Sequence, residues 1–118
     1  MSDGTLERLI ERFARAAARH HQAMEAMDEG EAHRQAAMIS TLFTGIAAQD
    51  GGRDALVVLM KHHDPAVAGM AAVYSLRHAT GASLTQLRTL AAEPGLLGYR
   101  AGMALERWER GEWDLDRE

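Results

Sequence analysis

The middle of the chain carries the stretch that decides the fold, DPAVAGMAA at residues 64–72. Aspartate before proline is typical of a helix start, because the carboxylate caps free backbone amides and proline lacks only a donor that would be unpaired there. The alanines that follow are strong helix formers, and their small side chains let neighbouring helices approach closely. We therefore expect a helix that starts at Pro65 and packs closely against its neighbours.

Two long helices are expected before this stretch. In the first segment, residues that would lie on one apolar face of a helix recur at alternating spacings of four and three positions. This spacing is typical of a helical seam with a seven-residue repeat. The seam consists of Leu6, Ile10, Phe13, Ala17, His20, Met24 and Met27. Asp28 and Glu31 then form a capping box, so a second helix is expected from there to about Gln49.

Two shorter hairpins are expected to follow. The helix that starts at Pro65 is preceded by another apolar helical pattern and is expected to continue to about His78. Ser83 and Gln86 form a second capping box, which predicts a further pair of helices. The expected segments are a leading hairpin over about 5–50, a central hairpin over about 53–80, a final hairpin over about 83–111 and an acidic tail over 112–118.

The predicted fold class is all-α, because no segment combines alternating polarity with β-branched residues. We expect one domain over residues 1–118, with about six helices in three antiparallel hairpins. An irregular helical bundle is the alternative. The last two hairpins also show a weak repeat at an offset of about 30 residues. The matches are Leu56 and Leu59 with Leu87 and Leu90, and Ala72 and Leu76 with Ala101 and Leu105.

Composition restricts the function classes. The chain has no cysteine, so disulfides, thiolate metal sites and cysteine nucleophiles are excluded, and a cytoplasmic location is expected. No apolar run approaches the roughly 18 residues of a membrane helix, and we expect neither a membrane span nor a signal peptide. The net charge of −4 argues against bulk nucleic-acid binding and is compatible with a basic protein partner.

The central stretch also resembles a known repeat. Residues 64–72, followed by Leu76, are similar to the start of the second helix of a HEAT repeat, with Ala68 where that family has the arginine of its Asp–Arg ladder. The wider layout resembles a small bacterial family of unknown function with a HEAT-like fold. The matching residues are Leu59, Met60, His62, Asp64, Pro65, Val67, Ala101, Leu105, Trp108 and Gly111. The resemblance implies a short right-handed stack and no catalytic residues. Some family members resemble immunity proteins that neutralise a toxin.

The remaining polar residues form few chemical patterns. Four arginines follow one side of the first helix, and we favour a solvated face over a site for phosphates or an acidic partner. They are Arg8, Arg12, Arg15 and Arg19. Among the six histidines, His21 has the spacing of a helical metal site with Glu25, but no His-Glu-x-x-His or Glu-x-x-His motif occurs. We interpret His20, in the apolar seam, as a hydrogen-bonded core residue. We therefore predict no catalytic, metal-binding or cofactor-binding residues.

These observations favour a non-catalytic protein-binding module, in its specific form an immunity protein that occludes a bacterial toxin domain. The alternatives are a homo-oligomeric helical protein, such as a homodimer paired through the first helix, and, less favoured, a metal- or nucleic-acid-linked activity. The predicted partner-binding residues are Asp28, Glu29, Glu31, Tyr74, Arg77, Trp113, Asp114 and Asp116. Trp113 is the aromatic residue expected near the surface, with packing back onto the last helix as the alternative, whereas Tyr74 is also expected to pack in the core.

Overall fold

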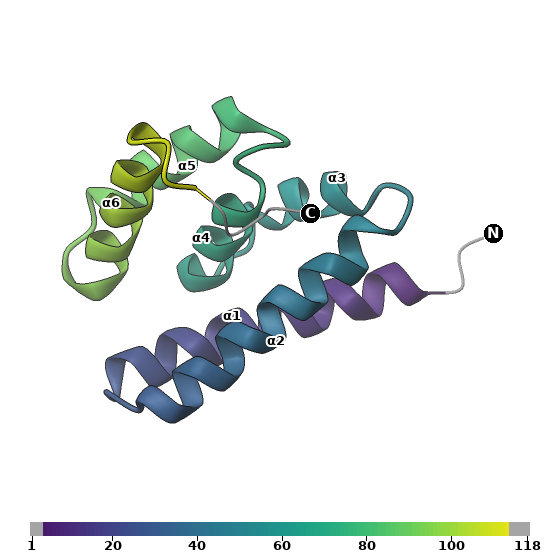
Figure 1. Ribbon diagram of the computed structural model, residues 1–118, viewed down its shortest axis with the longest axis horizontal. Coiled ribbons are helices and arrows are strands. Elements are labelled where there is room, and N and C mark those ends of the chain that lie inside the picture. Colours follow the sequence, from purple (N-terminus) through teal and green to yellow (C-terminus); the bar gives the residue numbers. More distant parts are fainter. Residues whose placement is uncertain (1–3, 114–118) are drawn as a thin grey trace.

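The computed structural model describes residues 4–113, and within that range the chain forms six α-helices and no strand (Figure 1). They are α1 (Thr5–Glu25), α2 (Glu29–Ala47), α3 (Gly52–Leu59), α4 (Pro65–Tyr74), α5 (Thr80–Ala91) and α6 (Gly95–Glu109). The predicted all-α fold class is confirmed. None of the helices in this range is long and apolar enough to cross a membrane.

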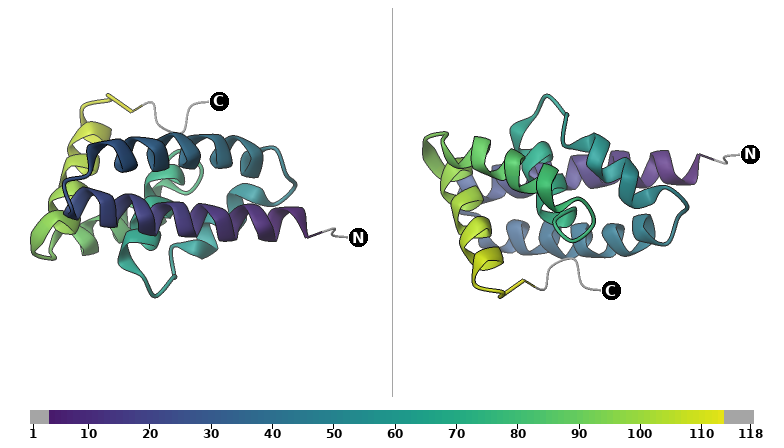
Figure 2. Two further views of the ribbon diagram at one scale, coloured as in Figure 1. Left: turned by 90° about the horizontal axis from the view of Figure 1, so that it is seen from below. Right: turned by 90° about the horizontal axis from the view of Figure 1, so that it is seen from above.

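The helices form two layers. The long helices α1 and α2 run antiparallel as a hairpin, and α3–α6 lie on one side of it (Figures 1 and 2). Figure 2 shows α6 crossing the hairpin near the turn that joins α1 to α2. This crossing brings the turn end of the hairpin close to α6, although the two are far apart in the sequence.

Helix α4 lies at the centre, as its almost uniformly apolar sequence requires. On one side Tyr74 contacts Phe13 of α1 and Phe43 of α2, with ring centroids 5.8 and 4.9 Å apart. On the other side Ala71 and Ala72 pack in a second cluster with residues of α5 and α6. One short helix therefore joins the leading hairpin to the rest of the protein.

Two expected helix starts are confirmed by their caps. The Oδ1 atom of Asp28 accepts a hydrogen bond from the amide of Glu31 at 3.1 Å, and Oδ1 of Asp64 accepts one from the amide of Ala66 at 2.9 Å. Pro65 occupies the first turn of α4. Aspartate at these positions pairs amides that have no partner within the helix, so local chemistry alone predicts these two boundaries.

The expected start of α5 and the expected end of α4 are wrong. Helix α5 begins at Thr80, and Ser83 lies fully buried inside it, where its hydroxyl donates to Sδ of Met60. Ser83 is one turn before the buried Leu87, so it shares the inward face, and packing overrides the capping preference of serine. Helix α4 ends at Tyr74, and hydrogen-bonded turns follow from Ser75 onward.

Close packing at the start of α6 allows a test of this fold. A Cβ atom at Gly98 would overlap the backbone carbonyl of Glu93, whereas a Cβ atom at Gly102 on the same helix would meet nothing within 4 Å. We expect Gly98→Ala to lower the free energy of unfolding by at least about 2 kcal/mol, because backbone must move. Gly102→Ala should raise it by roughly 0.5–1 kcal/mol through helix propensity. Urea unfolding of both variants measures this, and equal effects would contradict the packing.

Candidate functional site

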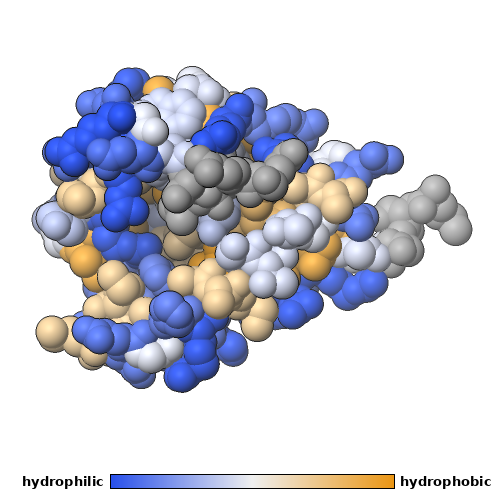
Figure 3. Space-filling view, in the orientation of Figure 1, coloured by the Kyte–Doolittle hydropathy of each residue, from blue (hydrophilic) through white to orange (hydrophobic). Residues whose placement is uncertain are grey.

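A groove of about 300 Å³ lies between the turn end of the leading hairpin and helices α4–α6. Its wall is mainly apolar, and Figure 3 shows hydrophobic residues along the hollow that separates the hairpin from the helices above it. The apolar side chains come from four helices and include Ile39, Met70, Val73, Leu90, Leu97 and Met103. We call this site the hairpin groove. It is open to solvent, so a ligand can enter without unfolding the protein.

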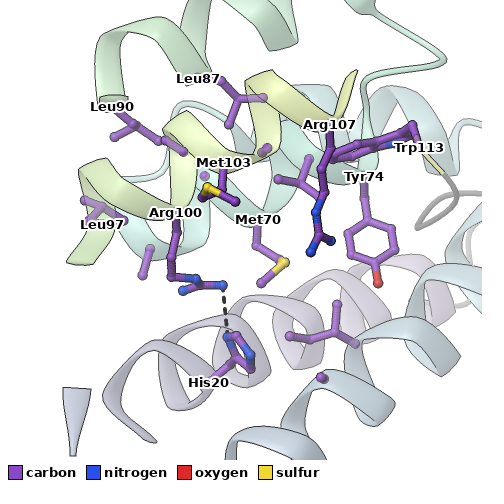
Figure 4. Close-up of a pocket in the computed structure, with 17 residues that line it drawn as sticks. His20, Met70, Tyr74, Leu87, Leu90, Leu97, Arg100, Met103, Arg107 and Trp113 are labelled. Atoms are coloured by element: carbon purple, nitrogen blue, oxygen red, sulfur yellow. Dashed lines mark hydrogen bonds between the residues drawn. The ribbon is translucent and has the colours of Figure 1, made fainter. Parts of the chain in front are cut away.

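Two arginines of α6 face the hairpin across this groove. Arg100 and Arg107 are seven residues, or about two turns, apart, so both side chains extend from the same side of the helix (Figure 4). The guanidinium of Arg100 donates to Nδ1 of His20 on α1 at 3.2 Å. Among residues 4–113 neither arginine forms an ion pair with a carboxylate. The groove therefore places positive charge beside an apolar wall without neutralising it.

His20 is held neutral in this setting. Burial, the positive charge of Arg100 and the neighbouring His21 lower its pKa from 6.5 to about 4. Burial also lowers the pKa of Arg100. Because the guanidinium can only donate, Nδ1 of His20 accepts and the ring proton resides on Nε2. The expected hydrogen-bonded role of His20 is confirmed, and its partner comes from the far end of the chain.

Trp113 closes one end of the groove, and the expectation that it lies near the surface is wrong. Its side chain is only 5 % exposed. The chain turns back after α6 at Gly111, which has a φ of 73°, and this lets Trp113 pack edge-on against Trp108 at 6.1 Å. Arg77 donates to the carbonyl of Trp113 and fixes this segment. Within residues 4–113 the indole nitrogen of Trp113 has no acceptor.

The structure separates the predicted partner-binding residues. Tyr74 is buried between Phe13 and Phe43, so its expected place in the core is confirmed, and its ring also reaches the groove wall. Arg77 is engaged within the chain. The acidic residues Asp28, Glu29 and Glu31 lie together at the hairpin turn. Asp114 and Asp116 fall outside the described residues.

The hairpin turn has an unusual feature of its own. Met27 is 87 % exposed and adopts a left-handed φ of 59°, the one non-glycine residue in the described range with a positive φ. The amide of Met27 bonds the carbonyl of Met24, and the amide of Asp28 bonds that of Ala23. This is a Schellman motif, whose left-handed position usually holds glycine. An apolar side chain therefore projects from a strained position between acidic residues.

Neither the arginine stripe of α1 nor the histidines outside the hairpin groove form a recognisable binding site in the described residues. The four arginines of the α1 stripe are all exposed, as a solvated face requires. Among residues 4–113 no three histidine or carboxylate side chains are grouped so that they could hold a metal ion. His21 and Glu25 form a single contact of 3.3 Å, and the rings of His62 and His63 stack at 4.3 Å.

Comparisons with known proteins identify neither a family nor a function for the chain. No protein-family model, no curated protein and no solved structure matches the chain. The resemblance to a HEAT-like family therefore stays a prediction, and the site is argued from its own geometry.

Acid sensitivity provides a test of the His20–Arg100 contact. A lowered pKa in the folded state means that the unfolded chain binds the extra proton first, so this stabilisation is complete above pH 6.5 and is lost as the pH falls toward 4. Allowing for solvent screening, we expect the native protein to lose about 1–2 kcal/mol more than His20→Gln between pH 7 and pH 5. Urea unfolding at both pH values measures the difference. Equal losses would show that His20 titrates normally.

Proposed function

We propose that this chain is a non-catalytic binding protein, and that the hairpin groove is its binding site. The observation that carries the proposal is the combination of an open apolar cavity with two arginines that have no carboxylate partner in the described residues. Ligand sites in proteins are mostly apolar, with a few polar groups that fix orientation. As part of this proposal the protein acts in the cytoplasm, which suits a chain without cysteine.

The chemistry of the groove supports binding over catalysis. Its wall consists of aliphatic, thioether and aromatic side chains together with two guanidiniums, which stay protonated at physiological pH. The one imidazole, His20, has a pKa of about 4, and its Nδ1 lone pair is already used by Arg100. A general base acts best with a pKa near the working pH. The groove is therefore better suited to hold a molecule than to transfer its protons.

A neutral fluorescent probe tests the groove directly. N-phenyl-1-naphthylamine should bind with one-to-one stoichiometry and increased fluorescence, because the apolar wall excludes water from the dye. Ala36 is exposed and lines the groove, so Ala36→Trp should fill it and weaken binding about tenfold or more. Ala37 is also exposed but lies outside the lining, so Ala37→Trp is the matched control. Equal binding by both variants, or no binding by the native protein, would contradict the proposal.

The hairpin turn supports a second candidate, the protein-binding role of immunity type. An exposed Met27 beside Asp28 and Glu29 offers an apolar anchor within a negatively charged surface, which suits a basic protein surface. A toxin domain bound there would be inhibited if the hairpin covered its active cleft. The proposed partner is then the product of an adjacent gene.

Met27 lets stability and binding be separated. Met27→Gly should raise the free energy of unfolding by about 0.5 kcal/mol, since glycine adopts the left-handed conformation without steric cost. The same variant should lose co-purification with the adjacent gene product if Met27 is an anchor. The exposed Val58 on α3 provides a control, because Val58→Ala should leave co-purification unchanged. Undiminished co-purification of Met27→Gly would remove the turn as the contact.

The burial of α1 gives the homo-oligomer alternative less support than the two binding proposals. That alternative rested on the seam of the first helix, and Phe13 and Ala17 in the middle of that seam are buried inside a single chain. Of the seam residues, only Met24 and Met27, at the turn end, are exposed. The buried part of the seam packs α1 within the protein, which supports the binding proposals more than pairing with a second copy.

A further inference from the structure

The hairpin groove offers hydrogen-bond donors that lack acceptors. The side chain of Arg107 makes no hydrogen bond or ion pair with any of residues 4–113, and within that range the side chain of Arg100 makes one hydrogen bond, to the neutral ring of His20. The indole N–H of Trp113, which also lines the groove, has no acceptor in the same range. Arg107 is exposed and keeps its hydration, but the buried indole N–H of Trp113 and the partly buried donors of Arg100 that lack acceptors cost free energy. A ligand that supplies acceptor oxygens would remove this cost.

The rest of the groove is suited to hydrocarbon. Met70 and Met103 lie beside the two arginines in Figure 4, and Leu90 and Leu97 line the wall farther along. Methionine side chains adapt to chains of irregular shape. Burying each methylene group of a ligand here contributes to binding, whereas a purely polar anion would leave this wall wet.

The size of the groove limits the ligand to a small molecule. A volume of about 300 Å³ is at the lower end of the range for small-molecule sites. One carboxylate can accept from an arginine through two parallel hydrogen bonds, and a neutral His20 adds no second cation to repel Arg100. The charge and the volume of the groove therefore both favour a small molecule that carries a carboxylate.

We propose that the hairpin groove binds an organic acid with an apolar tail, its carboxylate held by Arg100 and Arg107 and its hydrocarbon chain lying along the methionine- and leucine-lined wall. This inference rests on the proposed function and deepens it by naming the ligand class. It also assigns distinct parts to the groove residues: the arginines select the anion, and the apolar wall provides affinity that does not depend on charge.

Octanoate and 1-octanol separate these two contributions, because they share a hydrocarbon tail and differ in the head group. Each is titrated against the native protein loaded with N-phenyl-1-naphthylamine, and displacement of the dye gives the affinity. We expect octanoate to bind at least about tenfold more tightly than 1-octanol, since hydrogen bonds to charged groups are worth more than those between neutral ones. Acetate, which lacks the tail, should not displace the dye.

Variants assign the preference to residues. Arg107 is exposed, so Arg107→Gln should fold normally and weaken octanoate binding about tenfold without changing 1-octanol binding. Arg100→Gln should do the same, and its folding is checked by circular dichroism because it loses the contact with His20. Arg15→Gln removes an equal charge from the exposed stripe of α1 and should change neither affinity.

The outcomes distinguish this inference from the function on which it rests. Equal affinity for octanoate and 1-octanol in a protein that binds the dye would overturn the inference and leave the groove as an apolar binding site. Displacement of the dye by a short acidic peptide containing leucine, but not by octanoate, would overturn it in favour of a protein segment. Failure to bind the dye and both octyl compounds would overturn the inference and the proposed function together.

Discussion

The contact of Tyr74 with Phe13 and Phe43 is the interaction on which the rest of the structure depends. The three rings come from α4, α1 and α2, and the contact between Tyr74 and Phe13 is edge-on at an interplanar angle of 89°. Such pairs contribute roughly 0.5–1.5 kcal/mol beyond the area that they bury. Because the opposite side of α4 packs on α5 and α6, this contact fixes how far the hairpin stands from α6. The width of the hairpin groove follows from it.

Local chemistry predicted much of the fold, and the reasons are specific. Asp28 and Asp64 cap helices through their own neighbouring amides, so a short window of sequence contains everything that is needed. Ser83 and Gln86 have the pattern of a capping box, but the predicted helix start at Ser83 was wrong because its side chain points into the core against Met60. A capping pattern says which amides a side chain can reach. It does not say whether another part of the chain will bury that side chain first.

The hairpin groove could not be predicted in the same way. His20 and Arg100 are 80 residues apart, and their contact depends on how the two layers cross. Helical periodicity indicated that His20 faces inward, and the seven-residue spacing of Arg100 and Arg107 was a readable sign of one shared face. Neither pattern indicates that His20 and Arg100 contact each other. Trp113 was misplaced for a related reason, since its burial depends on a turn at Gly111 and on a bond from Arg77.

A preference for an anion is compatible with a chain of net charge −4 because the two effects act over different distances. A carboxylate about 4 Å from a guanidinium in a partly desolvated groove gains on the order of 4 kcal/mol, before desolvation costs are subtracted. Exposed carboxylates farther away than a Debye length, about 8 Å at physiological salt, are largely screened. The overall charge therefore changes how often an anion approaches the protein, while Arg100 and Arg107 decide whether it stays. The binding proposals for the acidic hairpin turn and for the basic groove are thus compatible with each other.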